Sequence, residues 1–367
     1  DKCLRFREIE LVKKELQFFI DKKVPQVKFV DRTFNCRHDH AMAIWTYIHE
    51  HDNGITNFHF EVSADLLNEK EIALINRMRP GLIQLEIGVQ SANEITIREI
   101  NRTMKIDVLS TIVDKIKKGN NVHQHLDLIA GLPYEGYESF GKSFDRVYKM
   151  NPEQLQLGFL KVLKGSVMHD RAQEYGIVYQ DRAPYEVLST KWLTYAEVIR
   201  LKQIEEMVEV YYNSGQFCCT MAALEQEFAS PFCMYECLAA YYDEKNAFAV
   251  SHSRIGRYEI LYDFIVKTCK ERSEQYMEML TLDMYLRDNV KKRPEFLRES
   301  GVSSDEAAAF YKKEEKERTY LKAYEGYDRR QMRKMTHLER IDGKTVLFDY
   351  KNRDPLTGNA AIYYLSE

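Results

Sequence analysis

Four polar residues in the first half of the chain stand inside otherwise apolar stretches: Glu61, Glu86, Gln90 and Asp127. In an extended strand successive side chains alternate between faces, so Glu86, Gly88 and Gln90 share one face. An isolated buried carboxylate is unfavourable unless a ligand, a cation or a hydrogen-bond donor pairs it. A neighbouring amide or lysine can do this for any one of them. Three carboxylates on neighbouring strands favour a polar ligand instead.

The elements that position these residues alternate in hydrophobic period. Amphipathic helical spacing alternates with short β-branched or apolar runs, which indicates βαβ crossovers and a parallel sheet. The polar residues then fall at the carboxyl ends of strands, where such folds bind ligands. The chain opens with a helix, so we expect an α/β fold: a partial (β/α)6 TIM-like barrel lacking its first strand. The predicted strands are 24–30, 58–62, 82–89, 122–129 and 155–163.

The second half has a different pattern. From about residue 188 helical spacing dominates, and Ile341-Asp342-Gly343-Lys344 has the composition of a hairpin turn. A further strand is predicted over 360–365. We therefore expect a small β module after an α-helical domain. The expected boundaries are a partial barrel at 1–165, a connector at 166–187, the helical domain at 188–330 and the β-hairpin module at 331–367.

Composition sets the broad class. The chain has 367 residues, 44% of them hydrophobic, and a net charge of −4 from 53 basic and 57 acidic residues. This is an ordered globular composition with no global signal for nucleic acid, and no apolar run is long enough to span a membrane. Seven scattered cysteines indicate thiols rather than a disulfide framework. The sequence therefore predicts a cytoplasmic protein that binds neither nucleic acid nor membrane.

Two strand-end motifs, in a fixed order, carry a family resemblance. Gly88-Val89-Gln90-Ser91 is followed by Asp127-Leu-Ile-x-Gly-Leu-Pro133. In this the chain resembles the radical S-adenosylmethionine superfamily over about residues 5–165. Asp31-x-x-Phe34 is similar to the branch with a cobalamin-binding domain, described as Fe-S oxidoreductases or magnesium-protoporphyrin IX monomethyl ester oxidative cyclase-like proteins.

The resemblance implies roles for four residues. The position of Glu61 takes the amino group of S-adenosylmethionine, which suits a carboxylate facing an ammonium. Those of Gln90 and Asp127 bond the ribose hydroxyls. Arg102, twelve residues after Gln90, matches an arginine that forks onto the methionyl carboxylate, although the same residue could serve as a surface helix cap. Glu86 lies deeper and supports the wall.

The chain also departs from the family. These enzymes hold a [4Fe–4S] cluster on a Cys-x3-Cys-x2-Cys loop, and the cysteines here do not have that spacing. We expect the cluster loop and a cobalamin domain in a longer protein, and this chain to be inactive without them. The resemblance implies methyl transfer or radical cyclisation or oxidation of a small molecule, with a reductant such as flavodoxin or ferredoxin.

Three other hypotheses remain open. His123-x-His125-x-Asp127 could seed a metal-dependent barrel hydrolase. A non-catalytic scaffold could bind a partner through tyrosine pairs, although one ring of each pair is expected in the core. Cysteines in the helical region could bind zinc or an auxiliary cluster, although packing is the commoner role of such residues. These cysteines are Cys218, Cys219, Cys233 and Cys237.

Overall fold

The computed structural model describes residues 4–290 and 292–365. Its contacts divide the chain into two compact units. The first comprises residues 1–208 with 231–233, and the second comprises 209–230 with 234–367.

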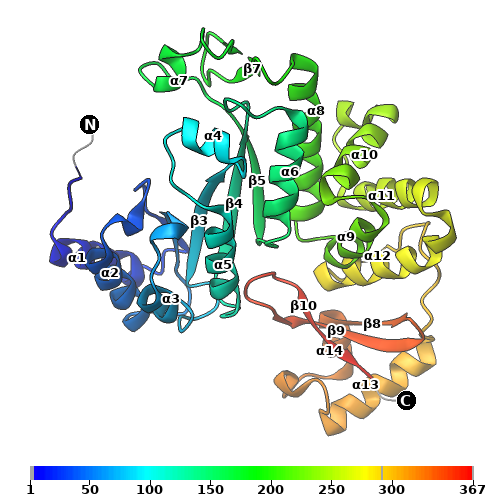
Figure 1. Ribbon diagram of the computed structural model, residues 1–367. Helices are drawn as coiled ribbons and strands as arrows, with labels where there is room; N and C mark the ends of the chain where they lie inside the picture. Colours follow the sequence, from blue (N-terminus) through cyan, green and yellow to red (C-terminus); the bar gives the residue numbers. More distant parts are fainter. Residues whose placement is uncertain (1–3, 291, 366–367) are drawn as a thin grey trace. The chain divides into compact units, whose positions relative to one another are not determined.

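The first unit contains a five-stranded parallel sheet in the order β1-β2-β3-β4-β5 (Figure 1). Each strand is followed by helix before the next strand begins, which confirms the α/β half-barrel. The strands are β1 Gln26–Lys28, β2 Asn57–Val62, β3 Ile83–Gln90, β4 His123–Ala130 and β5 Gln154–Phe159. The helices are α1 Ile9–Asp21, α2 His38–Glu50, α3 Glu69–Ile75, α4 Glu94–Glu99, α5 Ile106–Lys117, α6 Tyr137–Tyr148, α7 Val167–Asp170 and α8 Tyr195–Val208.

Alternation along the strands separates an apolar face from a polar face. Leu85, Ile87 and Val89 of β3 are fully buried, whereas the residues between them are half-buried. The amphipathic helix α5 contributes Leu109 and Val113 to the same core. Helix and sheet thus bury their apolar sides together, which is the main stabilising term of such a layer.

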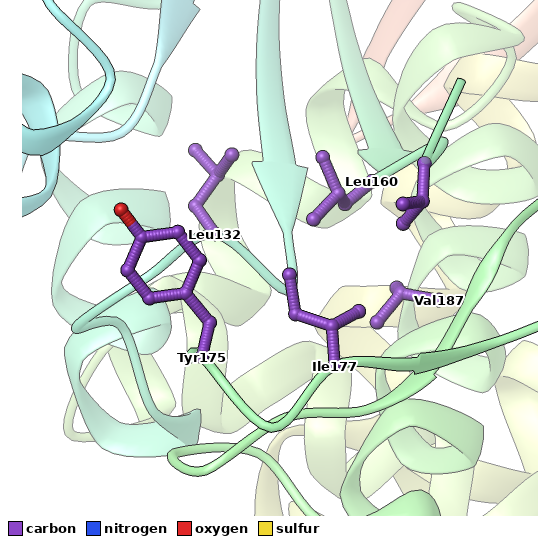
Figure 2. Close-up of a cluster of buried hydrophobic side chains, with 6 residues drawn as sticks. Leu132, Leu160, Tyr175, Ile177 and Val187 are labelled. Atoms are coloured by element: carbon purple, nitrogen blue, oxygen red, sulfur yellow. The ribbon is translucent and has the colours of Figure 1, made fainter. Parts of the chain in front are cut away.

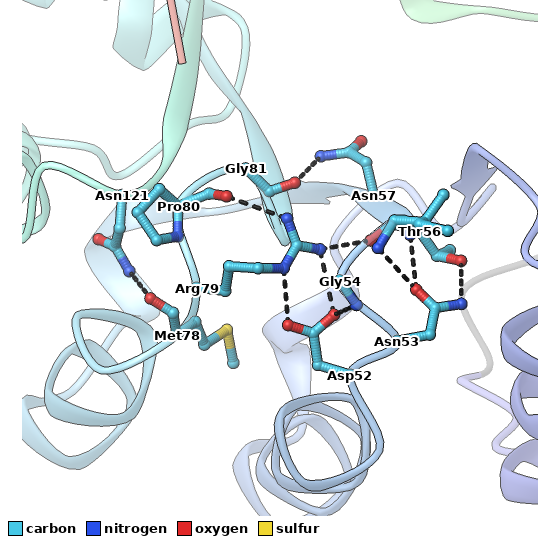
Figure 3. Close-up of polar contacts among 11 residues, drawn as sticks. Asp52, Asn53, Gly54, Thr56, Asn57, Met78, Arg79, Pro80, Gly81 and Asn121 are labelled. Atoms are coloured by element: carbon cyan, nitrogen blue, oxygen red, sulfur yellow. Dashed lines mark hydrogen bonds and ion pairs between the residues drawn. The ribbon is translucent and has the colours of Figure 1, made fainter. Parts of the chain in front are cut away.

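A polar clamp joins the loops at the amino ends of β2 and β3 (Figure 3). Arg79 Nε and Nη2 donate to the Asp52 carboxylate over 2.7 and 3.1 Å, and Nη2 also donates to the Thr56 carbonyl over 3.1 Å. Asn121 Nδ2 donates to the Met78 carbonyl over 2.9 Å. The clamp fixes the end of the sheet opposite the predicted site.

At the carboxyl ends of β4 and β5 the chain folds back over the sheet. The Val187 amide donates to the Leu160 carbonyl over 2.9 Å, so the segment beside the end of β5 runs antiparallel to it. Val187 belongs to β7 (Val187–Ser189), which pairs with β6 (Val178–Tyr179). An apolar cluster fixes this segment (Figure 2). It comprises Leu132, Leu160, Val162, Tyr175, Ile177 and Val187.

The second unit combines helices with a three-stranded antiparallel sheet in the order β10-β9-β8. Asp342 and Gly343 both have positive φ at the turn between β8 and β9, as a tight hairpin requires. The predicted hairpin and third strand are confirmed. The elements are α9 Cys218–Leu224, α10 Pro231–Glu244, whose first residues belong to the first unit, α11 Arg254–Thr268, α12 Ser273–Arg287, α13 Ser304–Glu317, α14 Arg329–Met335, β8 Thr336–Ile341, β9 Lys344–Arg353 and β10 Ala360–Tyr364.

The tyrosine pairs only partly follow the expectation of one core ring each. Tyr211 is buried and Tyr212 half-buried, as expected. Tyr241 and Tyr242 are both buried, since Tyr241 packs against Phe264 of α11 and Tyr242 against Tyr211, so this pair offers no ring to a partner. Among the described residues, no helix is long and apolar enough to cross a bilayer.

Candidate ligand site at the carboxyl edge of the half-barrel

The predicted residues Gln90 and Asp127 meet across neighbouring strands. Gln90 Nε2 donates to Asp127 Oδ2 over 3.0 Å. Gln90 ends β3 at a register shift and has φ of 70°, a left-handed conformation that is uncommon for a residue with a side chain. Such irregularities re-aim side chains at strand ends and gather at functional sites.

Arg102 returns to the same strand end. Its Nη1 donates to the Gly88 carbonyl over 2.9 Å, and the side chain is otherwise exposed. A Cβ on Gly88 would lie 2.8 Å from Gln90 Nε2 and 3.4 Å from Arg102 Nη1. A larger residue at position 88 would therefore displace the Gln90 amide from its observed position against the strand.

Glu61 lies beside Glu86 in the register of β2 and β3. Burial raises the pKa of Glu61, and the charge of Glu86 raises it further. Burial is the largest single influence on Glu86 and acts to raise its pKa, but the hydrogen bond and charge of Lys28, together with nearby histidines, outweigh it, so the pKa of Glu86 is lowered. The Lys28 Nζ–Glu86 Oε2 distance is 3.1 Å. Glu86 is therefore already paired, and the ion pair with Lys28 offsets part of the negative charge facing Glu61.

Asp127 has the most perturbed carboxyl group of this site. Burial raises its pKa from 3.8 to about 6, while the charge of Arg102 acts in the opposite direction. Asp127 Oδ1 is buried and has no hydrogen-bond partner within the protein. A buried acceptor of this kind is costly unless a ligand donor or water reaches it.

Deeper in the half-barrel the same face carries imidazoles. His59 Nε2 lies 3.0 Å from Glu86 Oε2, and β4 adds His123 and His125. Burial lowers the pKa of all three histidines, so each is held neutral at pH 7. The donor atoms of His123, His125 and Asp127 do not gather within 4.8 Å of one another in the described chain. The geometry gives no support to the hydrolase hypothesis.

One supporting residue was not predicted. The Glu135 carboxylate accepts hydrogen bonds from Ser91 Oγ over 2.8 Å and from Ser143 Oγ over 2.7 Å, and it is fully buried. Burial raises its pKa, and the two hydroxyl groups act against that rise. Glu135 thus joins the loops that follow β3 and β4. Only its position two residues after Leu-Pro133 marked it in the sequence.

Comparison with known families agrees with the half-barrel. Residues 2–147 match the radical SAM superfamily, and residues 173–355 match a family described as protein of unknown function (DUF4080). The first part of the chain, residues 2–147, therefore matches a radical SAM domain. The predicted resemblance to this superfamily is confirmed.

Individual proteins resemble short parts of the chain. Oxygen-independent coproporphyrinogen III oxidase of Salmonella typhimurium is 29% identical over 107 residues, which are 28% of this chain and 23% of that protein. The oxidase-like protein HemZ of Bacillus subtilis is 28% identical over 119 residues, which are 31% of this chain and 22% of that protein. The chain thus matches less than a quarter of the length of these relatives.

Two solved structures each align with less than half of the chain. The radical S-adenosylmethionine methyltransferase TsrM of Kitasatospora setae, with cobalamin and a [4Fe–4S] cluster bound, has a TM-score of 0.41 at 13% identity. This alignment covers 47% of the present chain and 33% of TsrM. Coproporphyrinogen III oxidase of Escherichia coli has a TM-score of 0.34 at 18% identity, with coverages of 44% and 40%.

Proposed function

We propose that the carboxyl edge of the half-barrel binds S-adenosylmethionine. The observation that carries the proposal is the meeting of Gln90, Asp127 and Arg102 around Gly88, from three separate parts of the sequence. Together they offer a buried acceptor, an amide and a guanidinium at one strand end.

The residues fit such a ligand by charge. Asp127 Oδ1 is an unpartnered buried acceptor that a ribose hydroxyl would satisfy, with Gln90 beside it. Arg102 is anchored at Gly88 and exposed, so its remaining N–H groups can fork onto a carboxylate. Glu61 would face the ligand's ammonium group. An ammonium at this place would lower the raised pKa of Glu61, because an opposite charge favours the ionised carboxyl.

The cysteines do not fit a [4Fe–4S] cluster. None has the Cys-x3-Cys-x2-Cys spacing in the sequence, and the candidate metal-ligating group found in the described residues contains two cysteines and one aspartate. We propose that a longer protein supplies the cluster. When bound beside such a cluster, S-adenosylmethionine is a source of the 5′-deoxyadenosyl radical. Without the cluster, we expect this chain to bind S-adenosylmethionine but to be catalytically inactive.

The finer assignment rests on the resemblance of Asp31-x-x-Phe34 to the cobalamin branch. On this basis we propose that the longer protein is a cobalamin-dependent Fe-S oxidoreductase that acts on a small molecule, by methyl transfer or by radical cyclisation or oxidation. A flavodoxin- or ferredoxin-like reductant and a cytoplasmic location complete the proposal. The domain boundaries at residues 165, 187 and 330 are kept as part of it.

Binding of S-adenosylmethionine to the purified chain tests the site. Arg102→Lys keeps the charge but loses the fork, and we expect its Kd to rise about tenfold, or about 1.4 kcal/mol. Arg98→Lys is the matched control, because Arg98 is exposed on α4 and bonds only its own helix in the described contacts. Equal Kd values in the wild type and in Arg102→Lys, Gln90→Ala and Asp127→Asn would contradict the proposal.

A longer protein that includes the cluster loop tests the reaction class. We expect 5′-deoxyadenosine release on reduction in the presence of S-adenosylmethionine. If variants of Gln90 and Asp127 released 5′-deoxyadenosine as fast as the wild type, the reaction would not depend on the site described above, and the proposed binding role of these residues would be wrong.

A further inference from the structure

Two adjacent cysteines meet a buried carboxylate in the second unit. Cys218 and Cys219 begin α9, and Asp283 lies 64 residues after Cys219, in α12. The amides of Cys219 and Thr220 donate to Asp283 Oδ1 and Oδ2 over 2.9 and 2.8 Å. These two bonds hold the carboxylate at the amino end of α9, where the two cysteines lie.

The geometry suits a small tetrahedral ion. The two Sγ atoms and a carboxylate oxygen of Asp283 all lie within 4.8 Å of one another, and Cys218 Sγ is 3.4 Å from Asp283 Oδ1. Zinc–sulfur and zinc–oxygen bonds of about 2.3 and 2.0 Å place sulfur and oxygen about 3.5 Å apart at the tetrahedral angle. The observed separation needs almost no adjustment to accept the ion.

The burial of the three residues differs in a way that suits ion entry. Cys218 is exposed, Cys219 half-buried and Asp283 fully buried, so one ligand is open to solvent as an entry path.

We propose that Cys218, Cys219 and Asp283 form a binding site for a thiophilic divalent cation, with zinc as the best match. Three protein ligands leave a fourth position open, as in zinc sites that also bind water. Binding replaces the thiol protons by the ion, so up to two protons are released for each zinc bound. Affinity should therefore increase with pH.

This site differs from the four-thiol site considered from the sequence. Neither Cys233 nor Cys237 belongs to the group of donor atoms within 4.8 Å among the described residues. In the observed group, Asp283 supplies the third ligand, a role that the four-thiol hypothesis gave to Cys233 and Cys237. Its distance along the sequence from the cysteines explains why spacing alone did not reveal it.

Zinc titration of the chelator-treated chain tests the site. We expect one tightly bound zinc per chain, and about hundredfold weaker binding in Cys218→Ser/Cys219→Ser, since losing ligands exceeds the 10–100-fold effect of outer-shell changes. Cobalt substitution should give a thiolate-to-metal absorption band that this double variant lacks. Cys233→Ser/Cys237→Ser is the matched control and should retain both signals.

Asp283→Asn separates metal binding from folding. The asparagine oxygen can still accept one amide hydrogen bond from α9 but carries no charge, so we expect a folded chain with weakened zinc binding. Unchanged zinc stoichiometry and affinity in Cys218→Ser/Cys219→Ser would overturn the proposal. So would the absence of tight zinc binding by the wild type, or a loss of zinc confined to Cys233→Ser/Cys237→Ser. None of these outcomes depends on S-adenosylmethionine.

Discussion

Replacing Asp127 by asparagine should stabilise the protein above pH 6 while weakening its ligand site. The aspartate is half-buried with its Oδ1 shielded from solvent, and this burial raises its pKa from 3.8 to about 6. Asparagine retains an oxygen that accepts the 3.0 Å hydrogen bond from Gln90 Nε2. The substitution therefore removes the cost of burying a charge but keeps the contact between the strands.

The magnitude follows from proton linkage. A folded-state pKa above the unfolded value means that the folded chain holds the proton more tightly, so this stabilisation is complete below pH 3.8 and is lost as pH rises through about 6. The difference of about 2.2 pKa units corresponds to about 3 kcal/mol. Asparagine does not titrate, so Asp127→Asn should gain up to this amount relative to wild type between pH 4 and pH 8. At about 2–4 °C per kcal/mol, the relative Tm should rise by about 6–12 °C.

Thermal unfolding of both proteins across this pH range measures the effect. Asp114→Asn is the matched control, because Asp114 is exposed on α5 and changes the net charge equally. Asp127→Asn should therefore raise the Tm but weaken the binding of S-adenosylmethionine. A Tm difference that does not change with pH would refute the reasoning about burial.

Three further predictions concern the half-barrel. Arg79→Met removes both bonds to Asp52 and should lower stability by about 1–3 kcal/mol, seen as a lower Tm, whereas the exposed Arg77→Met should not. Gly131→Ala introduces a Cβ 2.8 Å from Val187 Cγ1, at a residue whose φ is 88°. The substitution should lower the free energy of unfolding by more than the roughly 1 kcal/mol typical of backbone strain alone. Adding Val187→Ala should recover part of the lost Tm, and no recovery would exclude the clash. Burial lowers the pKa of His125, so the unfolded chain takes up a proton below pH 6.5 before the folded chain does; His125→Gln should lose less Tm than wild type from pH 7.5 to pH 5, and equal losses would contradict a buried neutral imidazole.

Much of the half-barrel was determined by local sequence. Strands and helices follow from hydrophobic periods of two and about 3.6 residues, which need no knowledge of distant contacts. The same period of two is sufficient to assign Glu86, Gly88 and Gln90 to one face of their strand. The hairpin between β8 and β9 followed equally from Asp342-Gly343, because only a few residue types adopt positive φ easily.

Strand lengths were less well predicted. The first strand was expected over 24–30, but β1 spans only Gln26–Lys28. The last parallel strand was expected to reach residue 163, but β5 ends at Phe159, beyond which the chain pairs with an antiparallel segment. Ends of strands depend on which partner is available for hydrogen bonding, and the partner lies elsewhere in the sequence.

Only the tertiary structure decided which residues far apart in the chain contact one another. Gln90 and Asp127 are 37 residues apart, Ser91 and Glu135 are 44 apart, and Cys218 lies 65 residues from Asp283. Strand register and helix packing set each of these distances. They also set the burial that raises the pKa of Asp127 to about 6. Sequence periodicity determines which face a side chain occupies, but burial and partners depend on long-range packing, because that packing alone fixes which groups are removed from water together.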